Sequence, residues 1–129
     1  MAVIVAADGK PTSENVLDYA FRYAKAFSEA LYVLRVMTSD DEADLEKSIA
    51  EAHEFFNGLK VRAGEEGLEI HTLLEHGSAA DSIIALAERL QASAIISGAS
   101  DKSGLGRLMM EGVAERLVRE ADCAVIVVR

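Results

Sequence analysis

Short apolar runs alternate with longer amphipathic segments along the whole chain. The apolar runs lie at residues 2–7, 31–37, 68–74, 94–97 and 123–128. Runs of this length, rich in valine, isoleucine and leucine, are typical of strands buried in a parallel sheet. Apolar residues recur at helical spacing over 14–28, 43–64 and 78–90, and a last helix is expected within 109–121. The pattern predicts strands and helices in strict alternation.

Turn and capping residues mark several of the boundaries. Ser13 follows a turn cluster and is the expected N-cap of the first helix. Gly64 and Gly67 are expected to end the second helix. Polar residues alternate with apolar ones in the third strand, which predicts a position near an edge of the sheet.

Strict alternation of short strands with helices predicts an α/β fold: a five-stranded, doubly wound parallel sheet with helices on both faces, of the flavodoxin or Rossmann kind. The chain has 129 residues, of which 50% are hydrophobic. This length and composition predict one domain that spans residues 1–129 and buries a core of its own.

The charge balance excludes some classes of partner. The formal net charge is −9, and no cluster of lysine and arginine interrupts the acidic surface. We therefore expect no binding to nucleic acid and no adsorption to an anionic membrane. A lone cysteine and the lack of a run of roughly 20 apolar residues predict a cytoplasmic protein without disulfides or membrane spans.

Few residues in the chain have the pattern of a catalytic or metal site. His53, His71 and His76 are spaced so that no metal site is expected among them. Cys123 opens an apolar strand, so it is interpreted as a small core residue and not as a nucleophile. No G-x-S-x-G nucleophile elbow is present. No catalytic residue is predicted.

Several segments together resemble the universal stress protein family. They are V-I-V-A-A-D-G at 3–9, E-H-G-S-A-A-D-S-I at 75–83 and A-E-R-L-V-R-E-A-D-C-A-V-I-V-V at 114–128. The resemblance implies a strand order of 3-2-1-4-5, with a crevice between strands one and four. It also implies stress-linked regulation and a homodimer that pairs the final strand, 123–128, across a two-fold axis.

Nucleotide-binding members of that family carry a motif of glycine, two residues, glycine, nine residues, glycine, then serine or threonine. In this chain, Gly98 fills the first place, but Asp101, Glu111 and Gly112 fill the other three. Gly104 lies between them and completes the candidate phosphate loop. Asp8 and Val36 match the family positions that lie on the adenine and ribose side. The resemblance thus implies a candidate nucleotide site made of Asp8, Val36, Gly98, Gly104 and Gly112.

Asp101 and Glu111 are expected to oppose a bound phosphate. Two unit charges about 5 Å apart repel by roughly 3 kcal/mol at an effective dielectric near 20. After screening, two carboxylates facing a triphosphate cost about 4 kcal/mol, which is roughly a thousandfold in affinity. If the last helix begins near Gly112, the Glu111 carboxylate also lies where it can take the place of the anion.

These observations favour a dimeric, non-catalytic stress-response module with weak or absent ATP binding. No cofactor is expected on this interpretation, and the protein acts through an unknown protein partner. The alternative is a regulatory switch that binds ATP or AMP through Asp8, Val36 and the loop after Gly98, with slow hydrolysis. A third interpretation is an electron-transfer or flavoprotein subunit, because related α/β folds serve those functions.

Overall fold

The computed structural model describes residues 1–7, 13–99 and 112–129. Strands and helices alternate along these ranges, as the hydrophobic pattern predicts. In chain order they are β1 (Ala2–Ala6), α1 (Glu14–Phe27), β2 (Ala30–Met37), α2 (Glu42–Glu66), β3 (Ile70–His76), α3 (Ala79–Leu90), β4 (Ala94–Gly98), α5 (Val113–Glu120) and β5 (Ala124–Val128). Asp8, Asp101, Gly104 and Glu111, which were singled out from the sequence, lie outside the described residues.

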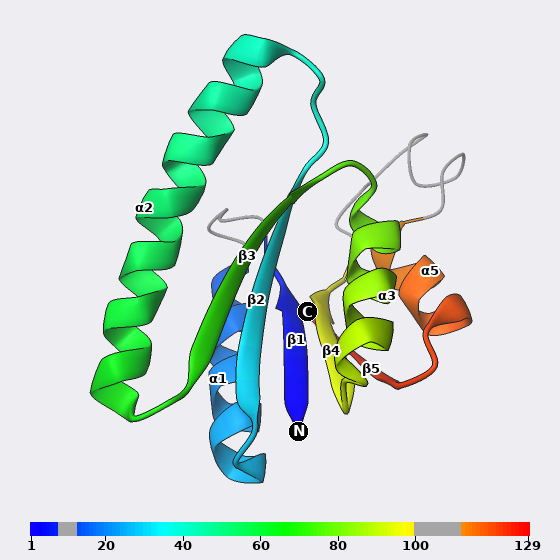
Figure 1. The fold of residues 1–129 in the computed structure, drawn as a ribbon. Helices are drawn as coiled ribbons and strands as arrows, with labels where there is room; N and C mark the ends of the chain where they lie inside the picture. The colour runs from blue at the N-terminus through cyan, green and yellow to red at the C-terminus, as the bar shows by residue number, and fades with distance from the viewer. Residues whose placement is uncertain (8–12, 100–111) are drawn as a thin grey trace.

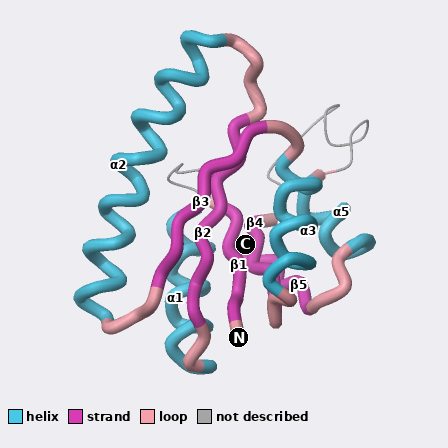
Figure 2. The backbone as a smooth tube through the Cα atoms, viewed as in Figure 1, coloured by secondary structure: helices cyan, strands magenta, loops and turns pink. Residues whose placement is uncertain are grey.

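The five strands form one parallel sheet in the order β3-β2-β1-β4-β5, which confirms the predicted fold (Figure 2). The central strand β1 pairs with β2 on one side and with β4 on the other, so Ile4 lies between Tyr32 and Ile95. β3 occupies one edge of the sheet, as the alternation of its polar residues predicts. β5 occupies the opposite edge.

Helices cover both faces of the sheet, with α1 and α2 on one face and α3 and α5 on the other (Figure 1). The pleat of β1 divides its side chains between two cores. Val3 and Val5 pack beneath α1 and α2, whereas Ile4 packs beneath α3 and α5. All three side chains are fully buried, which explains why β1 reads as a continuous apolar run.

The end of α2 differs from the prediction. Gly64 was expected to end this helix together with Gly67, but the helix passes through Gly64 and stops at Glu66. Gly67 is the C-cap and has φ of 68°, a left-handed conformation that glycine adopts at little cost. The Leu68 amide then donates to the Ala63 carbonyl at 2.9 Å. Since residues 67–69 form this helix end, β3 begins at Ile70 and not at the predicted Leu68.

α2 is the longest helix, and its first turns extend past the end of the sheet (Figure 1). Its buried residues begin only at Ala52. Its 25 residues carry many charges, and across the described ranges no helix is both long and apolar enough to span a membrane.

Candidate functional site

The sheet reverses its winding between β1 and β4. β1 leads into α1 on one face, whereas β4 leads toward α5 on the other face. These two neighbouring strands therefore mark the topological switch point of the sheet, and open α/β sheets bind ligands at the carboxyl ends of the strands at such a point. In a parallel sheet with alternating helices, the N-termini of α1, α3 and α5 lie at this same edge. The carboxyl edge of the sheet thus carries helix ends whose N–H groups favour an anion.

Gly98 ends β4 at the switch point and lies close to α1. A Cβ atom at position 98 would come within 3.2 Å of Val16 Cγ2, which is closer than ordinary van der Waals contact. Val16 is in the first turn of α1 and is buried. Glycine at position 98 therefore allows α1 to begin close to the end of β4. The next amide, of Ala99, donates to the Val128 carbonyl at 2.9 Å and extends the pairing with β5.

Gly112 is the N-cap of α5, so the last helix begins at the position from which the sequence analysis expects Glu111 to take the place of the anion. Gly112 is buried, and its carbonyl accepts the amide of Arg116 at 3.2 Å. Its φ of −75° is open to any residue, so the backbone does not require glycine here. Glu111 directly precedes this cap in the sequence. Gly112 and Gly98 thus lie at the same edge of the sheet. Gly98 lies beside α1, and Gly112 begins α5, which covers the opposite face.

Val36 lies near the carboxyl end of β2, where it is half-buried against the core beneath α3 and α5. Two contacts hold the chain that follows Val36. The Gly77 amide donates to the Met37 carbonyl at 2.9 Å, and His76 Nε2 lies 2.8 Å from the Ser39 carbonyl oxygen. The connection after β2 is therefore tied to the end of β3. This places Val36 at the same edge as Gly98, on the other side of β1.

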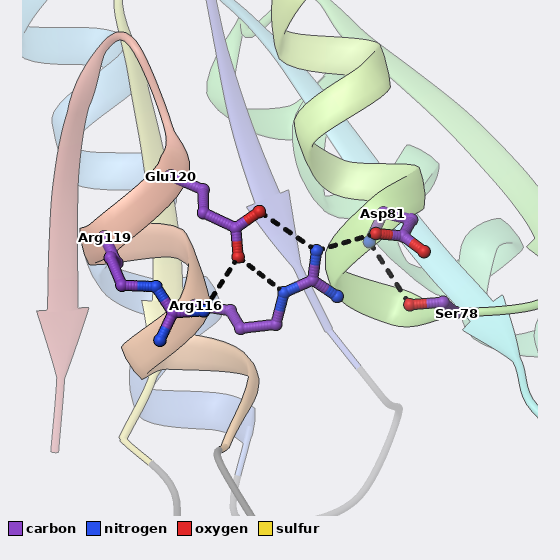
Figure 3. Close-up of polar contacts among 5 residues, drawn as sticks. All are labelled: Ser78, Asp81, Arg116, Arg119 and Glu120. Carbon is purple, nitrogen blue, oxygen red and sulfur yellow. Dashed lines mark hydrogen bonds and ion pairs between the residues drawn. The ribbon is translucent and has the colours of Figure 1, made fainter.

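An arginine that the sequence analysis did not single out joins α5 to α3. Arg116 Nη2 lies 2.7 Å from Asp81 Oδ1, and Arg116 Nε lies 2.8 Å from Glu120 Oε2 (Figure 3). The hydrogen bonds that Arg116 donates to Glu120, and then to Asp81, raise the pKa of Arg116, and they lower the pKa of Glu120 in turn. The i,i+4 spacing of Arg116 and Glu120 was visible in the sequence, but the partner on α3 was not.

The remaining candidate residues have structural contacts. His71 stacks on Tyr32, with ring centroids 4.6 Å apart, and its Nε2 lies 2.8 Å from Glu69 Oε2. Within the described residues, no group of histidine, cysteine and acidic side chains is arranged to hold a metal ion. Cys123 is partly buried beside the core beneath α3 and α5, and this burial raises the pKa of its thiol. A thiol with a raised pKa is a poor nucleophile, in keeping with a packing role.

Comparison with known proteins shows a match along the whole chain. The sequence model of the universal stress protein family matches residues 1–129. A universal stress protein of Methanocaldococcus jannaschii is 30% identical over 137 aligned positions, which cover 98% of this chain and 81% of that protein. A universal stress protein solved in complex with cAMP superposes with a TM-score of 0.83 at 20% identity, covering 100% of this chain and 97% of the other. The universal stress protein of Archaeoglobus fulgidus in complex with dAMP superposes with a TM-score of 0.76 at 26% identity, covering 100% and 98%.

Proposed function

Because the chain belongs to the universal stress protein family, we propose that it is a non-catalytic regulatory module of the stress response that holds an adenine mononucleotide in preference to ATP. The site is the crevice between β1 and β4, bordered by Val36, Gly98 and Gly112. On this proposal the base and ribose lie on the side of Asp8 and Val36. The single phosphate lies by the first turn of α5.

The observation that carries the proposal is the start of α5 at Gly112, directly after Glu111 in the sequence. Nucleotide-binding family members have glycine in the place of Glu111. A carboxylate next to a helix N-terminus competes with a bound anion for the same unsatisfied N–H groups. Asp101 adds a second negative charge to the same connection. The repulsion grows with the number of phosphates, because each additional phosphate brings more negative charge near the two carboxylates.

The solved relatives support a ligand with one phosphate. The Archaeoglobus fulgidus protein, at 26% identity, was solved with dAMP. An adenine mononucleotide retains the base and ribose contacts and carries less charge toward Asp101 and Glu111. The same crevice can therefore hold AMP while it excludes ATP.

A second candidate function is a module that binds no nucleotide and acts only through a protein partner. The position of Glu111 next to the cap of α5 favours it, since a carboxylate at this point can satisfy the helix N-terminus in place of a phosphate. The two candidates make opposite predictions for AMP.

In either case we propose a homodimer formed through β5. Within the described residues β5 pairs with β4 alone, so its outer edge carries unpaired N–H and C=O groups. Val127 on β5 and Val118 on the adjacent α5 are 42% and 61% exposed. An apolar edge strand of this kind is an aggregation hazard unless a partner covers it. Antiparallel pairing of the 123–128 segments of two copies covers it.

Calorimetric titration of AMP and of ATP with Mg²⁺ tests the proposal. We expect micromolar binding of AMP and binding of ATP that is about tenfold weaker or more, and no phosphate release above the buffer control. The charge-only variant Asp101→Asn/Glu111→Gln should strengthen ATP binding far more than AMP binding. Asp101→Gly/Glu111→Gly, which restores the family's glycines, should do the same.

Glu115→Gln is the matched control, because Glu115 is an exposed acidic residue in the first turn of α5. It removes a charge from the same helix without altering the motif, and its effect on ATP should be small. Equal affinity for AMP and ATP in the unaltered protein would refute the exclusion of ATP. If neither nucleotide binds, the second candidate function is the correct one.

A further inference from the structure

The contact between Arg116 and Asp81 joins the first turns of two helices. Asp81 is the third residue of α3, and its amide donates to the hydroxyl of the N-cap Ser78 at 3.3 Å. Arg116 is in the first turn of α5, where its amide reaches the carbonyl of the N-cap Gly112. The side-chain contact of 2.7 Å therefore links the first turn of α5 to the first turn of α3 (Figure 3).

Glu120 holds the guanidinium in the orientation that this contact needs. Its carboxylate accepts from Arg116 Nε at 2.8 Å and from Nη2 at 3.2 Å, a two-point contact within α5. A guanidinium held at two points loses little further freedom when it binds a third group. Nη2 is thereby directed across to Asp81 on α3.

The contact contributes little to overall stability. The Asp81 side chain is 68% exposed and that of Arg116 is 29% exposed, and ion pairs of this kind add little to the stability of the fold. The core that holds α3 and α5 to the sheet consists of other residues, among them Ile83 and Leu117. Loss of the contact therefore leaves the fold intact and changes only the position of the helix ends.

We infer that Arg116 is a positioning residue for the nucleotide crevice: by holding the first turn of α5 against α3, it fixes where the N–H groups after Gly112 meet a phosphate. This inference rests on the proposed function. Arg116 acts through the backbone of α5, since its guanidinium is already engaged by Asp81 and Glu120. Its loss therefore affects the phosphate end of the ligand and spares the base and ribose.

Titration of AMP and of adenosine against Arg116→Gln tests the inference, because adenosine has the same base and ribose but no phosphate. We expect AMP affinity to fall about tenfold, because the phosphate then meets a helix end that is no longer held in place, and adenosine affinity to stay unchanged. Arg119→Gln is the matched control, since it removes the same charge from α5 and leaves the contact with Asp81 in place. It should leave the affinity for both ligands unchanged. Unchanged AMP affinity in Arg116→Gln, or an equal loss for AMP and adenosine, would overturn the inference.

Hydrogen exchange of the ligand-free protein separates this inference from the proposed function. The amide of residue 116, which donates to the Gly112 carbonyl, should exchange faster in Arg116→Gln than in the unaltered protein once the intrinsic rates of the two side chains are allowed for, and Arg119→Gln should show no such change. If the unaltered protein binds neither ligand, the proposed function fails, but faster exchange would still support the positioning of α5 by Arg116. Unchanged exchange in Arg116→Gln refutes that positioning whether or not a nucleotide binds.

Discussion

The close approach of Gly98 to α1 makes a quantitative prediction. A methyl group added at position 98 would lie 3.2 Å from Val16 Cγ2, where ordinary contacts begin at about 3.4 Å. Val16 is buried in the first turn of α1, so it can move away only if that turn moves. Overpacking of this kind costs about 1–3 kcal/mol. Alanine also lowers the backbone entropy of the unfolded chain, which offsets about 0.4–1 kcal/mol of this cost. We expect Gly98→Ala to destabilise the protein by about 1 kcal/mol.

A double-mutant cycle isolates the contact. Val16→Ala alone should cost about 1–3 kcal/mol, because it removes buried methyl groups and leaves a cavity. In that background the atom that opposes the new Cβ is gone, so Gly98→Ala should be neutral or slightly stabilising. The coupling energy between the two substitutions should therefore be about 1 kcal/mol and favourable.

Urea unfolding followed by circular dichroism measures all four proteins of the cycle. Leu17→Ala serves as the control partner, since Leu17 is buried in the same turn of α1 but does not appear among the atoms close to position 98. Gly98→Ala and Leu17→Ala should be additive within about 0.5 kcal/mol. Additive costs for Gly98→Ala and Val16→Ala would show that Gly98 is not needed for the packing of α1, and the argument would fail.

Three further predictions concern the dimer edge, acid stability and the thiol. Val127→Glu should convert the proposed dimer to a monomer, as measured by sedimentation or light scattering. Val61 is an exposed valine on α2, so Val61→Glu is the control and should leave the dimer intact. A dimer that survives Val127→Glu would contradict pairing through β5. Hydrogen bonds from Lys25 and then Arg62 lower the pKa of Glu66 from its ordinary 4.5, so this carboxylate stabilises the fold above about pH 4.5, and the contribution disappears as the pH falls through the lowered pKa. Between pH 7 and pH 3, the melting temperature of the unaltered protein should therefore fall further than that of Glu66→Gln. Equal falls would argue against these contacts. The Cys123 thiol, whose pKa burial raises, should react with a disulfide reagent at pH 8 far more slowly in the folded protein than in urea; equal rates would show that it is accessible.

The hydrophobic pattern was sufficient to predict the strands and helices, but it did not predict every one of their boundaries. Gly64 was expected to end α2 because glycine is a poor helix former. Its cost of about 1 kcal/mol is small against the burial of Leu59 and Ala63 in the core beneath α1 and α2, to which ion pairs of the last turn add a little. Arg62 contacts Asp18 on α1 and Glu66 contacts Lys25, each at 2.8 Å. These partners lie far away in the sequence, so a local pattern does not reveal them.

The candidate site was predictable only in part, for a similar reason. The motif located Gly98 as its first glycine and Gly112 at its serine or threonine place, and the structure places both at the carboxyl edge of the sheet. Strand order came from the resemblance, since alternation alone leaves it open. Asp81 and Arg116 are 35 positions apart. Their contact depends on α3 and α5 sharing one face of the sheet, which follows from the topology and not from either segment alone.

The division of the protein into two hydrophobic cores has a consequence for how such proteins diverge. Within the described residues, most of the side chains that fill the two cores lie within the body of the strands and helices or at the amino edge of the sheet, and those at the carboxyl ends of strands are few, among them Ala6, Ala7, Val36, Leu74 and Val128. Exchange of glycine for acid in the connections at the carboxyl edge should therefore alter ligand binding more than it alters folding. Grafting such connections between relatives is accordingly a practical way to build sensors with new ligands on one scaffold.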